Sequence, residues 1–264
     1  MLTTTEAAEI AGVAPSTLKR WADQGLLPIV RTPGGHRRFE RDSLDLLLQT
    51  EAGAGAERPA ISGWIRCLLD GQRHEIDGRL LEARSRLGTW CSVADELGAA
   101  LVELGEHWEC GRLTVADEHA ASDALARALA RVGDALPVSR SGNVCLLACA
   151  GDEEHTLGLS LAELTLREVG WAPLWLGRRT PVAEIVRVAK GGRVGLVALS
   201  ASLCSSREAA LRDVVKQVGA ACAEQKIGLV LGGAGAWPQR PARGVRLTSF
   251  VDFHDYLALK RRTP

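Results

Sequence analysis

The sequence predicts a multidomain protein of α and α/β character, with an N-terminal winged helix-turn-helix, a four-helix bundle and a C-terminal Rossmann-like parallel sheet. Three observations lead to this fold class. Two short helical patterns and a basic Pro-Gly-Gly turn occupy the first 50 residues. Apolar residues then recur at spacings of three and four from residue 61 to about 136. Beyond residue 143, short continuous apolar runs alternate with helical stretches, a pattern typical of a parallel sheet covered by helices.

Length and composition limit the class of protein. The chain has 264 residues, of which 46% are hydrophobic and 24% are charged, enough for two domains or three small ones. Lys plus Arg and Asp plus Glu each number 32, so the neutral total excludes a uniformly basic nucleic-acid binder but allows a local basic patch. The seven cysteines form no CxxC pair, which argues against a disulfide framework, a zinc ribbon and an iron–sulfur cluster.

The sequence also carries no targeting or membrane signal. The N-terminus lacks a basic-then-apolar pattern, and no apolar run approaches about 18 residues. We therefore expect a cytoplasmic protein with reduced thiols and no membrane partner.

Residues 1–50 are expected to form the winged helix-turn-helix. Thr4 and Thr5 precede an Ala-rich stretch, as an N-cap precedes a short helix. A Gly-containing turn leads to a second helix over residues 17–24. Residues 30–39 hold one Pro and two Gly between extended residues and predict a two-stranded wing. Asp42 is expected to cap a further helix.

Three further segments follow. Residues 51–60 lack large apolar side chains and are expected to be a linker. Residues 61–137 are expected to form four helices packed as a bundle. Residues 138–264 are expected to form the parallel sheet, in which ligands bind beyond the carboxyl ends of the strands. The four strands are expected at residues 144–148, 173–177, 194–200 and 227–231.

The wing carries a local basic patch. Between residues 31 and 41, four Arg and one His stand against a single Glu. A planar guanidinium donates two parallel hydrogen bonds to phosphate, and a recognition helix presents its N-terminal side chains to base edges. The candidate DNA-contacting residues are therefore Ser16, Thr17, Lys19, Arg20, Arg31, His36, Arg37 and Arg38. The alternative, on periodicity alone, is a solvated basic turn on an unrelated helical domain.

A family resemblance favours the DNA-binding interpretation. The run TPGGHRRF from Thr32 to Phe39, with the helix-turn-helix pattern before it, resembles the winged domain of MerR-type transcription regulators. The match covers essentially the whole N-terminal segment. It implies a homodimer that reads two half-sites of a double-stranded DNA operator. The second helix would enter the major groove, and Arg37 and Arg38 would lie in the wing against phosphates or the minor groove.

A polar loop follows the first expected strand, where a doubly wound sheet binds its ligands. The loop contains Glu153, His155 and Gly158. An imidazole can ligate a metal while a nearby carboxylate holds its other ring nitrogen and fixes the tautomer. The plainer alternative is that His155 is a polar surface residue.

This loop and the ends of two later strands together resemble the cobalamin-binding Rossmann-like domain. The residues that carry the resemblance are Glu153, His155, Gly158, Ser200, Ser202, Gly232 and Gly233. The resemblance implies cobalamin as cofactor, with His155 as the lower ligand of its cobalt, a serine in contact with the nucleotide tail and the two glycines leaving room for that tail. Glu153 stands where the family has Asp, and Ser202 stands where Leu would complete the serine motif.

The helical segment carries a second, independent resemblance. Trp108, followed ten and eleven residues later by Glu118 and His119, is similar to the Trp-x9-Glu-His signature of the light-responsive, cobalamin-dependent CarH/LitR group. The resemblance implies that Trp108 covers the upper ligand, adenosyl in adenosylcobalamin, and that Glu118 and His119 line the same pocket. In that group a histidine directly follows the Trp. Here the following residue is Glu109, and the neighbouring histidine is His107, on the other side of Trp108.

Taken together, the resemblances imply a transcription regulator, a repressor, whose oligomeric state and operator binding are controlled by adenosylcobalamin acting as a light sensor. A dimer or a tetramer is expected. One alternative is a MerR-type regulator that senses cobalamin or another ligand without light. Another is a corrinoid carrier or cobalamin enzyme, which would not need residues 1–50. The sequence shows no nucleophile–base–orienter constellation, so we expect no enzyme.

Overall fold

The computed structural model describes residues 1–11, 15, 18–19, 22, 27–32, 36–45, 63–70, 73–137, 143–202 and 207–262. The chain forms two compact units: residues 1–71 together with 100–122, and residues 72–99 together with 123–264. Most of the expected second helix, the Pro-Gly-Gly tip of the wing and the expected linker lie outside the described residues. The domain boundaries drawn from the sequence stay predictions.

The N-terminal segment contains helix α1 (Thr4–Ala11) and a two-stranded antiparallel wing made of β1 (Ile29–Arg31) and β2 (Arg37–Phe39). Residues 41–45 are helical. The wing confirms the sequence prediction. A small hydrophobic core joins these elements, and Ile29 of β1 packs against it. Its buried members are Ala7, Leu18, Leu27, Phe39 and Leu44.

Two helix starts differ from the sequence prediction. The N-cap of α1 is Thr3, not Thr4 or Thr5. The Thr3 hydroxyl accepts a hydrogen bond from the Glu6 N–H at 3.2 Å, and the Glu6 carboxylate accepts one from the Thr3 N–H at 2.8 Å. This is a capping box, which satisfies two N–H groups reciprocally. The Thr3 hydrogen bonds lower the pKa of Glu6. The helix after the wing begins at residue 41, one position before the expected cap Asp42.

Four helices follow, as predicted. They are α4 (Gly63–Asp70), α5 (Arg73–Leu87), α6 (Trp90–Glu109) and α7 (Val115–Ala135). Thr114 and Asp117 form a second capping box at the start of α7, with the Thr114 N–H 2.9 Å from the Asp117 carboxylate. In the described part of the chain, no helix combines the length and the apolar character needed to cross a membrane.

The C-terminal part is a five-stranded sheet in which every neighbouring pair is parallel. The strands are β3 (Val144–Cys149), β4 (Ala172–Gly177), β5 (Leu196–Ser200), β6 (Gly228–Gly232) and β7 (Val245–Arg246), in the order β4-β3-β5-β6-β7. The helices are α8 (Leu157–Glu168), α9 (Val182–Lys190), α10 (Glu208–Glu224) and α11 (Phe250–Arg262). The four predicted strands are confirmed to within two residues, whereas β7 and α11 were not predicted.

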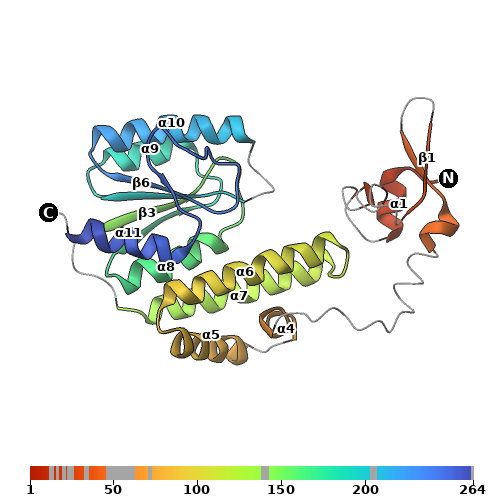
Figure 1. Cartoon of the computed structure of the whole chain (residues 1–264), viewed down its shortest axis with the longest axis horizontal. Helices are drawn as coiled ribbons and strands as arrows, with labels where there is room; N and C mark the ends of the chain where they lie inside the picture. The colour runs from red at the N-terminus through yellow and green to blue at the C-terminus, as the bar shows by residue number, and fades with distance from the viewer. Residues whose placement is uncertain are drawn as a thin grey trace. The chain divides into compact units, whose positions relative to one another are not determined.

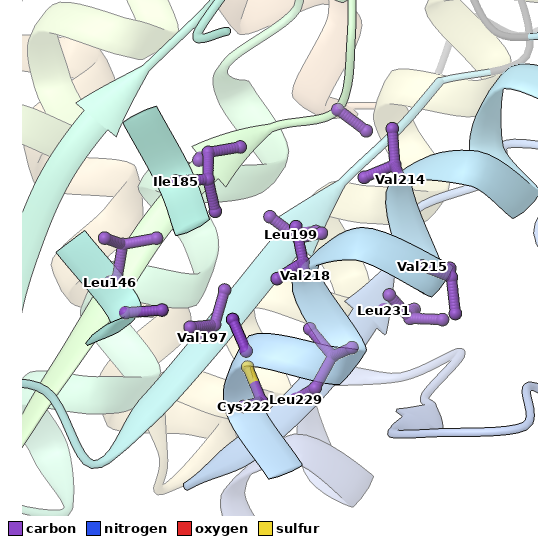
Figure 2. Close-up of a cluster of buried hydrophobic side chains, with 14 of the residues drawn as sticks. Leu146, Ile185, Val197, Leu199, Val214, Val215, Val218, Cys222, Leu229 and Leu231 are labelled. Atoms are coloured by element: carbon purple, nitrogen blue, oxygen red, sulfur yellow. The ribbon is translucent and has the colours of Figure 1, made fainter. Parts of the chain in front are cut away.

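Two hydrophobic cores cover the two faces of this sheet. Successive residues of a strand point to opposite faces, so Leu146 and Cys145 of β3 belong to different cores. The first core packs against α9 and α10, and the second against α8 and α11 (Figure 1). Figure 2 shows the first core, where Ile185 of α9 and Val218 of α10 lie over the strands. This three-layer arrangement explains why the strands read as continuous apolar runs.

Reciprocal caps fasten the first half of α6 to this α/β part. The Glu168 carboxylate, at the end of α8, accepts the N–H of Trp90 at 2.8 Å and pairs with the Arg84 guanidinium at 3.0 Å. In return, the Asp95 carboxylate of α6 accepts the N–H of Phe250 at 2.6 Å, at the start of α11. Each carboxylate thus satisfies an otherwise unpaired N–H of a helix terminus.

Candidate functional site

The strand order places a topological switch point at the carboxyl edge of the sheet. The chain leaves β3 toward β4 on one side and later returns to β5 on the other side of β3. At such a switch point the two following loops diverge, and doubly wound folds bind ligands there. Glu153 and His155 lie in the loop after β3, Gly158 lies in the first turn of α8, Ser200 ends β5 and Ser202 follows it.

A buried carboxylate holds the His155 ring. Glu153 has no exposed surface, and its Oε1 lies 2.6 Å from His155 Nδ1. The same oxygen accepts the backbone N–H of His155 at 2.8 Å. One carboxylate oxygen of Glu153 therefore makes two hydrogen bonds to His155, the residue two positions later in the chain.

This contact determines the chemistry of the imidazole. A hydrogen bond of 2.6 Å to a carboxylate requires the proton on Nδ1, so the neutral ring keeps an unprotonated Nε2. Within the described residues, Nε2 makes no hydrogen bond, and 62% of the His155 side chain is exposed. In metal-ligating histidines, one ring nitrogen is typically hydrogen-bonded to a carboxylate while the other is free to bind the metal. His155 has this arrangement. The residues therefore fit a cofactor whose metal approaches from outside the sheet.

The loop after β5 completes this arrangement. Glu153 Oε2 accepts the backbone N–H of Ser202 at 2.6 Å, and the Ser202 hydroxyl lies 3.3 Å from His155 Nδ1. The Glu153 carboxylate thus bridges the loops that follow two neighbouring strands. Gly158 backs onto Ser200, because a Cβ at residue 158 would lie 3.1 Å from the Ser200 hydroxyl oxygen. A side chain at residue 158 would therefore press against the Ser200 hydroxyl, so glycine suits this close approach of α8 to the end of β5.

Gly232 ends β6, and Gly233 follows it. Both glycines make close contacts with residue 201 of the same chain. Gly233 has a φ of +82°, and a Cβ there would lie 2.3 Å from the Ala201 carbonyl oxygen. The Ala201 N–H in turn donates to the Gly232 carbonyl at 3.2 Å, and the Trp237 indole N–H donates to the same oxygen at 2.7 Å. The expected role of Gly232 and Gly233 toward a cofactor tail stays a prediction.

Two residues at this edge were missed by the sequence analysis. The N–H of Arg179, which follows β4, donates to the Glu153 carbonyl at 3.1 Å, and its guanidinium pairs with Glu154 at 2.9 Å. The Cys149 thiol, at the end of β3, lies 3.5 Å from the His155 carbonyl oxygen. Burial, and to a smaller extent the charge of Glu153, raises the pKa of Cys149 to about 12. Arg179 could have been identified from the sequence, because it follows the carboxyl end of a predicted strand.

The residues predicted to cover the upper face of the cofactor lie around the turn between α6 and α7. Trp108 is half-buried near the end of α6. Glu118 and His119 lie in the first turns of α7, with His119 Nε2 3.5 Å from the Glu118 carboxylate. They belong to the other compact unit, so their relation to His155 stays a prediction.

The histidine before Trp108 is turned inward. His107 is 6% exposed, and its Nε2 lies 3.6 Å from the Glu103 carboxylate. Its Nδ1 is buried and has no hydrogen-bond partner among the described residues. Glu109, on the other side of Trp108, is exposed. The two neighbours of Trp108 thus point in different directions, as adjacent helical residues must.

The candidate DNA-contacting residues are only partly described. Ser16, Thr17 and Arg20 lie outside the described residues. The backbone of Arg31 ends β1. Lys19 and His36 are exposed, and Arg37 and Arg38 are half-buried on β2.

Arg37 also makes an internal contact. Its Nη1 donates to the Lys19 carbonyl at 2.8 Å and so fastens the wing to the second helix.

Two family models match separate parts of the chain. Residues 1–52 match the helix-turn-helix domain, and residues 61–132 match the B12 binding domain. The HTH-type transcriptional repressor CarH of Myxococcus xanthus is 31% identical over 239 residues, covering 76% of this chain and 79% of that protein. The dimethylamine corrinoid protein of Methanosarcina barkeri is 27% identical over 144 residues, covering 49% of this chain and 68% of that protein.

A solved structure shares the fold. The structure of the Methanosarcina barkeri monomethylamine corrinoid protein superposes with a TM-score of 0.59 at 13% identity, and the match covers 76% of this chain and 97% of that chain. At this identity the likeness concerns the fold alone. It confirms the predicted fold class, in which a helical segment precedes a Rossmann-like parallel sheet, and the helix-turn-helix match confirms the N-terminal domain.

Proposed function

This chain belongs to the CarH family of HTH-type transcriptional repressors, and on that basis we propose that cobalamin held at the carboxyl edge of its sheet controls its binding to operator DNA. At the level of the family, it is a cobalamin-binding helix-turn-helix regulator. The expectation that it is not an enzyme is confirmed by the same relationship. What remains to be proposed is the form of the cofactor, the residues that hold it and the signal.

The observation that carries the proposal is the His155 ring, held through Nδ1 by a buried carboxylate 2.6 Å away and open at Nε2. We propose that Nε2 ligates the cobalt from below. Glu153 keeps the proton on Nδ1 and, as a carboxylate, increases the basicity of the ligating nitrogen. Ser202 supports Glu153 through its backbone N–H. When bound, adenosylcobalamin would supply the cobalt that His155 ligates and a cobalt–carbon bond that light can cleave.

The remaining predicted residues take supporting roles in the proposal. Ser200 and Ser202 contact the displaced nucleotide tail, with Gly158, Gly232 and Gly233 shaping the neighbouring backbone. Trp108 packs over the upper ligand, and Glu118 and His119 contact it. The capping box at the start of α7 supports this arrangement, because it fixes the first turn that carries Glu118 and His119.

Control of DNA binding is proposed to act through assembly. Loss of the upper ligand removes contacts of Trp108, Glu118 and His119, and the dimer or tetramer changes in consequence. DNA-binding heads that are linked in one assembly bind an operator far more tightly than single heads. This works only if the two assemblies bind the cofactor with different affinity.

One observation favours a second candidate, a repressor that senses cobalamin without light. Glu109 replaces the histidine that follows Trp108 in the light-responsive group, and His107 is buried against Glu103. Neither residue offers an accessible imidazole that could take the upper position after the adenosyl group is lost. A light response in this chain could therefore not use a histidine next to Trp108 as the upper ligand.

The deciding experiment uses the full chain, purified in the dark with adenosylcobalamin. Its visible spectrum, oligomeric state and operator affinity are compared before and after green light. We expect a histidine-ligated corrinoid whose assembly and DNA affinity change together on illumination. Unchanged assembly with bound corrinoid would remove light as the signal and leave the second candidate.

The cofactor ligand is tested by His155→Ala, which should lose the spectrum of histidine-ligated corrinoid. The matched control is His74→Ala, which removes an exposed histidine from the same compact unit. Retention of the histidine-ligated spectrum in His155→Ala would show that another residue ligates the cobalt.

A further inference from the structure

Three side chains that can ligate a metal converge away from the His155 loop. Cys91 lies in the first turn of α6, Glu168 ends α8 and His254 lies on α11. One ligand atom from each lies within 4.8 Å of the other two. They come from sequence positions 77 and 86 residues apart, so the fold and not the local sequence brings them together. We propose that this cluster binds a zinc ion, independently of the proposed cobalamin function.

The donor set favours zinc over other divalent cations. A thiolate, an imidazole and a carboxylate are the ligands that Zn²⁺ combines in proteins, whereas Mg²⁺ and Ca²⁺ prefer oxygen alone. Bonds of about 2.0–2.3 Å around a tetrahedral ion need ligand atoms roughly 3–4 Å apart. The side chains therefore need to move by only about an ångström. Water would fill the fourth position.

The charges in the cluster suit a divalent cation. Binding displaces the Cys91 thiol proton to solvent, so the thiolate brings one negative charge to the ion, and the Glu168 carboxylate brings a second that it shares with the Arg84 guanidinium. Glu168 already interacts with positive groups, since it accepts the N–H of Trp90 and pairs with the Arg84 guanidinium. These contacts orient the carboxylate before an ion arrives. Cys91 is buried, while Glu168 and His254 are partly exposed, which leaves a way in.

The location gives the ion a structural role. Glu168 caps α6, and α6 in turn caps α11 through Asp95. A zinc ion bound to Cys91, Glu168 and His254 would join the same three helices, α6, α8 and α11, by coordination bonds. The proposed site therefore strengthens the attachment of α6 to the α/β part of the chain.

The test uses the full-length chain purified without cobalamin and stripped of metal. We expect it to retain about one equivalent of added Zn²⁺, to melt at a higher temperature with zinc, and to show a thiolate-to-metal absorption band when Co²⁺ is the probe. Cys91→Ser should abolish the band. His254→Gln should weaken zinc binding at least about tenfold.

Three matched variants serve as controls. Cys110→Ser and His74→Gln remove an exposed cysteine and an exposed histidine, and both should leave the band and the affinity unchanged. His155→Ala should also bind zinc normally, which separates this proposal from the cobalamin site. A missing band in the parent chain, or a band that survives Cys91→Ser, overturns the proposal. If Cys91→Ser does not fold, His254→Gln decides, because unchanged zinc affinity in that variant also overturns it.

Discussion

At the scale of single residues, Glu153 is the most constrained group at the carboxyl edge of the sheet. It is fully buried, yet both of its oxygens accept hydrogen bonds, from His155 and from Ser202. A buried carboxylate is stable only when its oxygens are satisfied in this way. Its position two residues before His155 could be predicted from the sequence. Its second bond could not, because Ser202 is 49 residues away and follows a different strand.

Replacing Glu153 with Gln tests its role behind the histidine. The amide is nearly isosteric but carries no negative charge, so it can neither fix the Nδ1 proton as firmly nor increase the basicity of Nε2. We expect cobalamin affinity to fall by about 10- to 100-fold. Titration of the purified chain with cobalamin, followed by visible absorption, measures this change.

Glu154→Gln is the matched control. It changes the neighbouring carboxylate, which pairs with Arg179 at the surface. An equal loss of affinity in both variants would mean that general charge, and not the bond to His155, matters.

At the scale of elements, helix and strand positions followed largely from periodicity. The strands β3 to β6 were predicted because each is a buried apolar run between turn residues. Helix α11 was missed because its inward residues Phe253 and Leu257 are separated by polar and charged positions, which weakens the apolar pattern. The wing was predicted from Pro and Gly, but its attachment was not, since Arg37 bonds to a carbonyl 18 residues away.

The cap that Asp95 provides for α11 predicts a stability effect. In Asp95→Ala, the N–H groups of Phe250 and Val251 lose their acceptor. We expect the α/β part to be destabilised by about 1–2 kcal/mol, as for other lost N-caps. Urea unfolding followed by far-UV circular dichroism measures this difference.

Asp123→Ala serves as control for Asp95→Ala. Asp123 pairs with Arg127 one turn later on an exposed face, an interaction worth only a few tenths of a kcal/mol. A loss of stability as large as that of Asp95→Ala would argue against the cap as the cause.

The wing predicts a salt-dependent effect on DNA binding. If Arg38 contacts a phosphate, Arg38→Ala should weaken operator binding and reduce the slope of log affinity against log salt by about one per contact. Fluorescence anisotropy at several salt concentrations measures both. Arg41→Ala is the control, because the Arg41 guanidinium is paired with Asp45 at 3.2 Å. Equal slopes in all three proteins would exclude a phosphate contact of Arg38.

At the scale of the whole molecule, the net charge is zero although the wing is basic. Electrostatic attraction to DNA therefore has to come from the wing and not from the protein as a whole. Two family models match the first two predicted segments, the helix-turn-helix domain over residues 1–52 and the B12 binding domain over residues 61–132. What the sequence could not provide is the oligomeric state, because surface complementarity between copies leaves no periodic signal. The proposed control of assembly therefore has to be measured.

Linkage gives that measurement a quantitative form. If cobalamin favours one assembly, it must raise the association constant of the protomers by the factor by which assembly raises cobalamin affinity, multiplied once for each site, which is the square of that factor for a dimer. Sedimentation at several protein concentrations, with and without the cofactor in the dark, gives the first factor. Cobalamin titrations at low and high protein concentration give the second. An association constant that cobalamin leaves unchanged would show that assembly and cofactor binding are controlled separately.

The capping of α6 by α8 and of α11 by α6 has a consequence for how the chain denatures. The start of α6 depends on a carboxylate of α8, and the start of α11 depends on a carboxylate of α6. A fragment beginning after residue 137 would leave Phe250 and Val251 without their acceptor, so the sheet does not possess all the groups that complete it. Residues 72–99 and the sheet should consequently melt in one cooperative transition.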